Sequence, residues 1–142
     1  MTQQQLSLFD QPTLNTCRDQ KLAMSVGADR CGLSREEIVD QMNALAKRCG
    51  VNLASNGDLQ MHTFEKWLNP NDLSRQSPTR ALSIFCAVVR DTSALDVLAR
   101  PLGAAVIGLK EQNLLKWARA YMRKRDASKT MRRIEGDLGG ID

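Results

Sequence analysis

The chain has 142 residues, of which 42% are hydrophobic and 4% aromatic, and it carries a formal net charge of +4. This length fits one domain with a modest core plus an appended element, and the scarcity of aromatic residues favours packed helices over a β-sandwich or a β-barrel. The longest uninterrupted apolar run, Ile84–Val89, has six residues, which is far too short for a transmembrane helix.

The cysteines and the single histidine argue against a metal centre. The four cysteines include no Cys-x-x-Cys pair, and His62 is the only histidine, whereas a structural zinc site takes four ligands at short spacings. We therefore expect buried structural thiols, no metal and no other cofactor. No charged and apolar leader precedes the first predicted helix, which favours a cytosolic, soluble and reduced protein.

The first third of the chain predicts an arm and two helices. Residues 1–12 contain glutamines and a proline and are expected to be disordered. Leu14–Arg30 is compatible with one helix. Ser34–Glu37 forms a capping box, in which the serine and the glutamate three residues later satisfy two unpaired amides, so a helix begins there. Its apolar positions recur at spacings of four and three until Gly50 ends it.

Asn56-Gly57 interrupts the helical pattern between flanking apolar residues. This dipeptide is typical of a two-residue hairpin turn, because both of its central positions favour positive φ. A small hairpin and a tight loop fit the segment equally well. Thr63–Leu68 then predicts a short helix that stops at Asn69-Pro70, since the residue before proline avoids the helical region.

The second half of the chain predicts three more helices. Ser77-Pro78 begins one, with proline at its first helical position, and Ala94–Leu102 supplies a fifth. A long basic helix is expected from Leu109 to about Ile134. We expect an all-α protein with a compact five-helix helix-turn-helix domain over residues 13–108, a basic amphipathic helix over 109–136 and a disordered tail over 137–142.

The short helix around residues 60–68 carries the functional prediction. Phe64 and Trp67 lie three apart and are expected to face the core, while the polar residues around them point outward. Polar side chains at the start of such a helix can meet base edges in the major groove of DNA, and cations beside it can hold phosphates. The predicted DNA-binding residues of this region are Gln60, Met61, His62, Glu65, Lys66 and Arg75.

Three stretches resemble the λ-repressor-like regulators of temperate phages, in particular the phage regulatory protein CII group and similar small proteins of Mu-like prophages. They are Leu33–Met42, Thr63–Pro70, and Ser77–Asp91 followed by Ala94–Leu98, and together they span roughly residues 30–105. The resemblance implies an all-α domain that binds DNA through residues 60–66.

The chain departs from this family in the loop before the reading helix. In a compact motif the turn glycine lies about five residues before the position that Thr63 matches, whereas Gly50 lies thirteen residues before it. We therefore expect an insertion on the surface, because the entropy cost of a loop rises only slowly with its length.

Positive charge is concentrated in the last predicted helix. Lys110–Arg133 contains nine basic and two acidic residues, and such a stripe favours a polyanionic partner. Its predicted DNA contacts are Lys116, Arg119 and Arg123. The apolar side of this helix has three alternatives: it closes the core, pairs with its copy in a dimer, or leaves the helix free to lie along DNA.

The N-terminal stretch Gln5-Leu6-Ser7-Leu8-Phe9 resembles the pentapeptide with which bacterial polymerases and their accessory proteins bind the replicative sliding clamp. Gln5, Leu6, Leu8 and Phe9 occupy the matching positions. The resemblance implies that two apolar side chains fill a pocket while the glutamine amide forms hydrogen bonds.

No catalytic set is visible in the sequence, so we do not expect an enzyme. The leading hypothesis is a prophage-type transcriptional regulator that binds double-stranded DNA as a homo-oligomer, since one small domain reads few base pairs. The alternative is an adaptor that binds the sliding clamp or another replication protein through residues 5–9.

Overall fold

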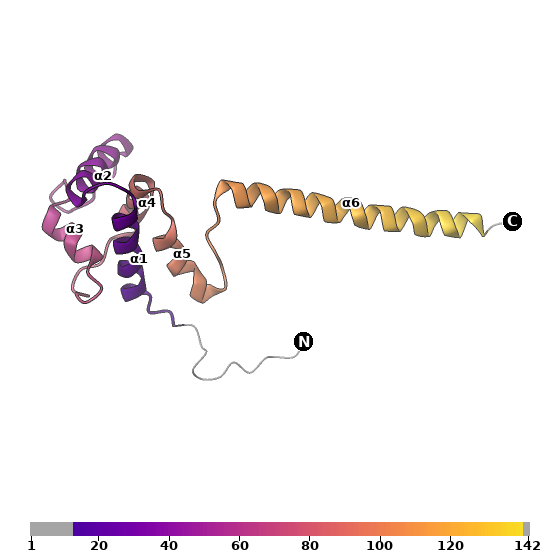
Figure 1. The fold of residues 1–142 in the computed structure, drawn as a ribbon, viewed down its shortest axis with the longest axis horizontal. Helices are drawn as coiled ribbons and strands as arrows, with labels where there is room; N and C mark the ends of the chain where they lie inside the picture. Colours follow the sequence, from indigo (N-terminus) through magenta and orange to yellow (C-terminus); the bar gives the residue numbers. More distant parts are fainter. Residues whose placement is uncertain (1–12, 141–142) are drawn as a thin grey trace. The chain divides into compact units, whose positions relative to one another are not determined.

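The computed structural model describes residues 13–140 of the chain, and these residues are helical throughout their regular structure (Figure 1). The all-α prediction is confirmed for this part of the chain. The helices are α1 (Cys17–Arg30), α2 (Arg35–Cys49), α3 (Met61–Leu68), α4 (Thr79–Val89), α5 (Ser93–Ala99) with a 3-10 turn η1 (Arg100–Leu102), and α6 (Leu109–Gly139).

The chain divides into two compact units, Met1–Val106 and Ile107–Asp142. The described part of the first unit contains α1 to α5 and the hydrophobic core, and the second contains α6. The predicted arm over residues 1–12 lies outside the described residues. The predicted disordered tail over 137–142 is wrong for its first half, because Asp137–Gly139 continue α6: no proline stops the helix before the Gly139-Gly140 pair.

The capping box of α2 forms as predicted. The backbone N–H of Glu37 donates to the Ser34 hydroxyl at 3.1 Å, and the Ser34 N–H donates to the Glu37 carboxylate at 2.7 Å. At the other end Gly50 adopts φ of 69° and closes the helix in the left-handed region, where a side chain would be strained. Both ends of α2 are therefore fixed by local sequence.

The core of the first unit is aliphatic with two packed phenylalanines. Phe64 of α3 and Phe85 of α4 have ring centroids 6.2 Å apart and are at most 1% exposed. Around them α1 packs on α3 and α5, and α2 packs on α4. Burying a side chain of this size stabilises the fold by roughly 1.5 to 3 kcal/mol, so the two rings tie α3 firmly to the scaffold.

Several predicted helix boundaries differ from the structure by one to five residues, among them the start of α5 at Ser93 instead of Ala94 and the end of α6 at Gly139 instead of Ile134. α1 begins at Cys17 instead of Leu14, α3 begins two residues early at Met61, and Pro78 is the N-cap of α4 instead of its first helical residue. The fifth helix ends at Ala99 and tightens into η1, because Pro101 has no N–H to donate to the preceding turn.

The insertion between α2 and α3 is a tight loop, which decides between the two alternatives for Asn56-Gly57. Its pairing within the described residues is a single bridge between Ala54 and Gly57, and Gly57 has φ of 106°. A single bridge is too little pairing for a hairpin with two strands. The flanking apolar residues Leu53 and Leu59 turn inward and are 2% exposed.

Candidate nucleic-acid interface

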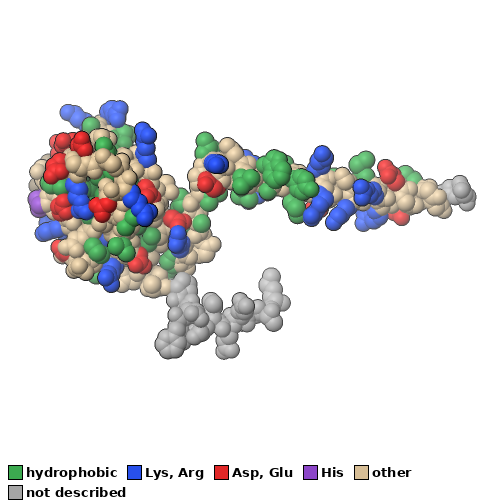
Figure 2. Space-filling model, viewed as in Figure 1, with side chains coloured by type: hydrophobic (Ala, Val, Ile, Leu, Met, Phe, Trp, Pro, Cys, Tyr) green, Lys and Arg blue, Asp and Glu red, His purple; other side chains and the backbone are tan. Residues whose placement is uncertain are grey.

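The short helix α3 exposes one polar face over an apolar underside. Phe64, Trp67 and Leu68 are at most 3% exposed, and their spacing of three and one places them on the same side of the helix. His62 and Lys66, four residues apart, lie on the opposite side and are exposed. His62 is the purple side chain at the surface of Figure 2. The outward placement predicted for these two residues is confirmed.

Met61 does not belong to this exposed face. It is half-buried and packs against the core, which contradicts its prediction as an outward DNA contact. The reason is periodicity: Met61, Phe64 and Leu68 follow the three-four spacing of one helical face, so an outward Met61 would require Phe64 to leave the core.

Asn43 of α2 fixes the start of α3. Its side-chain amide donates to the Leu59 carbonyl at 3.1 Å, and its carbonyl oxygen accepts from the Leu59 N–H at 2.8 Å. These two bonds satisfy both backbone groups of a residue that is 2% exposed. Because Gln60 is the N-cap of α3 and makes no side-chain cap bond, the position of the helix start depends on this contact across the insertion.

Lys21 of α1 fixes the other end. The side chain is 1% exposed, and its ammonium group donates to the Lys66 carbonyl at 2.7 Å and to the Arg75 carbonyl. Burial lowers the pKa of the Lys21 ammonium from its ordinary value, and Asp72 counteracts this lowering. The buried cation thus joins the last turn of α3 to the segment that follows it.

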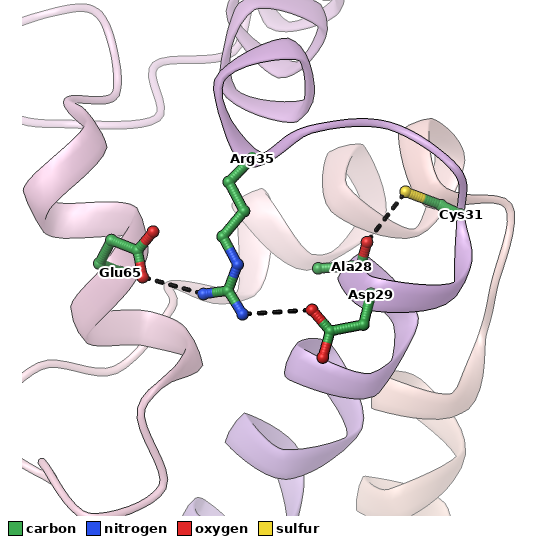
Figure 3. Close-up of polar contacts among 5 residues, drawn as sticks. All are labelled: Ala28, Asp29, Cys31, Arg35 and Glu65. Atoms are coloured by element: carbon green, nitrogen blue, oxygen red, sulfur yellow. Dashed lines mark hydrogen bonds and ion pairs between the residues drawn. The ribbon is translucent and has the colours of Figure 1, made fainter.

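Arg35 links α3 to both of the first two helices (Figure 3). Its guanidinium contacts the Glu65 carboxylate at 2.9 Å and the Asp29 carboxylate at 3.3 Å. Glu65 is exposed as predicted, but its charge is paired by Arg35. The pair neutralises the Glu65 carboxylate on this face and gives Glu65 a structural contact between α2 and α3.

A polar groove runs along one side of α3. It lies between the 53–58 loop, the first residues of the helix and the segment 74–80, and its lining includes Gln60, His62, Thr63, Arg75, Gln76 and Arg80. Gln76 is half-buried, and its Oε1 atom is fully buried without a hydrogen-bond partner among the described residues. Two arginines beside a polar helix face suit a ligand with both anionic and hydrogen-bonding groups.

The structure brings together part of the predicted DNA-binding set. Gln60, His62 and Arg75 line the groove. Glu65 and Lys66 lie at a second, smaller hollow on the α1 and α2 side of the helix. Lys116, Arg119 and Arg123 belong to α6, in the second unit.

Sequence reasoning missed several groove residues, among them Thr63, Gln76 and Arg80. Arg80 lies in the first turn of α4, where its guanidinium donates to the Asn52 carbonyl at 2.6 Å. This bond closes one end of the groove onto the insertion. The available signal was its position two residues after Pro78, on the exposed side of an otherwise apolar helix.

The helix α6 has no buried residue, and all of its residues are exposed except the half-buried Ala118. It carries nine basic and four acidic residues, a net charge of +5. On the face seen in Figure 2, hydrophobic side chains gather on the first half of the helix and basic ones are more frequent farther along it. Trp117 and Tyr121 stack with centroids 5.6 Å apart and ring planes 18° apart, and both rings are more than half exposed.

The thiols and carboxylates of the described residues form no metal-binding group of three or more His, Cys, Asp or Glu. The four cysteines are free. Cys86 is buried, Cys17 and Cys31 are half-buried, and Cys49 is exposed, so the expected burial of all four thiols holds only for Cys86. No helix between residues 13 and 140 has the length and apolarity needed to cross a membrane.

Comparison with protein-family models, curated proteins and solved structures finds no match to this chain. The resemblance to phage regulators therefore stays a prediction.

Proposed function

We propose that this protein binds double-stranded DNA through α3 and the adjoining groove, and acts as a transcriptional regulator of the prophage type. The observation that supports this most is the way α3 is held in the fold. Its apolar side is buried in the core, side-chain hydrogen bonds fix both of its ends, and its polar side, which includes His62 and Lys66, is directed to solvent. A rigid, exposed polar helix is what base recognition requires.

The dimensions of α3 suit the major groove. An α-helix with its side chains is about 10 to 12 Å in diameter, and the major groove of B-DNA, about 12 Å wide, admits it. In this arrangement Gln60 pairs with an adenine edge, His62 and Lys66 contact neighbouring bases or phosphates, and Arg75 and Arg80 hold the backbone beside the helix. Glu65 stays bound to Arg35 and faces no phosphate alone.

Fluorescence anisotropy with a library of labelled duplexes tests the proposal. We expect binding that weakens steeply with salt, because neutralised phosphates release counterions. The double variant Gln60→Ala/Lys66→Ala should lose about tenfold or more in affinity for preferred sequences, since each good base contact contributes roughly 1 to 3 kcal/mol. The matched control is Arg100→Ala, which removes one exposed cation outside α3 and its groove.

Equal losses in the double variant and in Arg100→Ala would contradict sequence reading by α3. An absence of salt-dependent binding to any duplex would contradict DNA binding altogether.

A second candidate function, binding to the replicative sliding clamp, is favoured by the Gln5–Phe9 stretch alone, and these residues lie outside the described residues. Its test is competition for the clamp pocket by a peptide of residues 1–12. A Leu8→Ala/Phe9→Ala variant of the full chain should lose clamp binding and keep DNA binding. If neither the peptide nor the chain binds the clamp, this candidate fails without affecting the first.

A further inference from the structure

One face of α6 has an acid at its start, apolar residues in its middle and a cation at its end. Glu111, Leu114, Ala118, Tyr121 and Arg125 succeed one another at spacings of three, four, three and four, so they lie on one side of the helix. We refer to these five residues as the seam. Trp117 lies beside the seam and stacks on Tyr121.

The seam has no partner within the second unit. Leu114 is 64% exposed, Trp117 63% and Tyr121 54%. A patch of large apolar side chains of this kind is uncommon on a monomer and marks an interaction surface. An isolated helix also gains most of its stability from packing its apolar face, so a partner for the seam would stabilise α6 itself.

The charges at the two ends of the seam are complementary to those of a second seam that runs in the opposite direction. In a pair of antiparallel helices centred near Ala118, Glu111 of one copy comes within about one helical turn of Arg125 of the other, and this happens at both ends of the pair. In a parallel pair the two copies of Glu111 meet and the two copies of Arg125 meet, which is repulsive at both ends. Antiparallel helix dipoles add to the preference.

We propose that α6 pairs with α6 of a second copy of this chain, antiparallel, through Leu114, Ala118 and Tyr121, with reciprocal Glu111–Arg125 contacts at the two ends. Within its own helix the Arg125 side chain reaches only Asp126, at 3.9 Å, so its guanidinium has donors left for a carboxylate of the second copy. The proposal does not depend on DNA binding.

The area available is enough for a modest dimer. A fully exposed aromatic side chain buries about 150 to 250 Å². Since Trp117 is 63% and Tyr121 54% exposed, two copies of this pair contribute roughly 350 to 600 Å², and Leu114 and Met122 add to this. Specific interfaces begin near 1,000 Å². We therefore expect dimerisation at micromolar concentration and not an obligate dimer.

Pairing through the seam leaves most cations of α6 in solvent. Lys116, Arg119 and Arg123 lie on the opposite side of the first half of the helix, and Arg132 lies beyond the paired segment. These positions stay free to contact phosphates, as the DNA-binding prediction for the three residues requires.

Sedimentation velocity of the full chain over a concentration series tests the seam. We expect a concentration-dependent dimer in the wild type and a monomer in Leu114→Glu. The matched control is Ile134→Glu, because Ile134 is also an exposed aliphatic residue of α6, at 48%, and the helical period places it on the opposite side. The control should dimerise as the wild type does, and circular dichroism should show that both variants keep α1 to α5 folded.

A charge swap tests the orientation. Glu111→Arg and Arg125→Glu should each weaken the dimer roughly tenfold, because each substitution replaces two attractive contacts with two repulsive ones, and the double variant should return to within about threefold of the wild type. In a parallel dimer the single variants would have little effect, since like charges already face each other.

A monomer at all concentrations overturns the proposal. This holds even if fluorescence shows that the Trp117 ring is shielded, because the ring would then be covered by this chain itself or by another ligand. Equal dimer loss in Leu114→Glu and Ile134→Glu overturns the seam as the interface. Failure of the double charge variant to recover overturns the antiparallel arrangement. DNA binding by the monomeric variant would leave the proposed function standing independently.

Discussion

The ammonium group of Lys21 donates a hydrogen bond of 2.7 Å to the backbone carbonyl of Lys66, so a cation of α1 that is 1% exposed holds the last turn of α3. A second bond from the same group reaches the Arg75 carbonyl. One buried charge therefore sets the positions of α3 and of the groove wall that follows it. Since buried lysines are rare unless paired, removal of this one should have a measurable cost.

We predict that Lys21→Met lowers the free energy of unfolding by about 2 to 4 kcal/mol. Methionine keeps most of the apolar stem but leaves two carbonyls without a donor, and an unsatisfied buried polar group costs about 1 to 3 kcal/mol. Urea denaturation followed by circular dichroism measures the change. Lys47→Met, at an exposed position of α2, is the control and should stay within about 0.5 kcal/mol of the wild type. A stable Lys21→Met variant would show that the two bonds contribute nothing.

The pair between Arg35 and Glu65 predicts a rescue on the DNA-binding face. Arg35→Ala leaves the Glu65 carboxylate unpaired beside Lys66 and should weaken duplex binding about threefold to tenfold, while unfolding changes by about 1 kcal/mol or less because the pair is partly exposed. Adding Glu65→Gln to this variant should restore affinity. Anisotropy titrations of the two variants decide the matter, and a double variant as weak as Arg35→Ala would place Glu65 away from the DNA.

Three aspartates predict how stability depends on pH. The hydroxyl and N–H of Ser74 lower the pKa of Asp72, those of Ser93 lower the pKa of Asp91, and the Val106 N–H with Arg100 lowers the pKa of Asp96. An acid with a depressed folded-state pKa contributes stability that is present above its unfolded value, here 3.8, and is lost as the pH falls through the folded value.

The first unit should therefore keep its stability from neutral pH down to about pH 5 and lose it progressively below about pH 4. Urea midpoints measured across this range give the profile. In Asp91→Asn the loss below pH 4 should be shallower, because the asparagine does not titrate. An unchanged profile in that variant would mean that the Ser93 contacts do not favour the charged form of Asp91.

The cysteines should differ in their reactivity. Cys49 is exposed at the end of α2, whereas burial raises the pKa of the Cys86 thiol and keeps it protonated and shielded. In native conditions an alkylating reagent should modify Cys49 first and Cys86 last, and in urea all four should react. Peptide mass spectrometry after timed quenching gives the order. Early modification of Cys86 would indicate that α4 opens locally.

Local signals predicted the helices well where they satisfy backbone groups directly. The Ser34–Glu37 capping box and Gly50 gave both ends of α2, and Asn69-Pro70 gave the end of α3. The burial of Phe64 and Trp67 also followed from spacing alone. These features depend on residues within one turn of each other, so a single sequence contains the information.

The contacts that complete the candidate site could not be predicted in this way. Lys21 reads as an ordinary exposed lysine, and its bond to Lys66 spans 45 positions. The bond between Arg80 and Asn52 spans 28, and it depends on how the insertion folds back. Met61 belongs to the stretch that was predicted to contact DNA, whereas its position in the helical period, three residues before Phe64, places it inward.

Because two hydrogen bonds join Asn43 to Leu59, the position of α3 does not depend on the length of the loop that precedes it. Residues 54–58, which follow the buried Leu53, connect two points that are already fixed, so a shorter or longer connector there changes the rim of the groove without tilting the helix. This loop is consequently a suitable place to insert a fluorophore or an affinity tag, and in the course of divergence it offers a means of changing selectivity while the scaffold stays as it is.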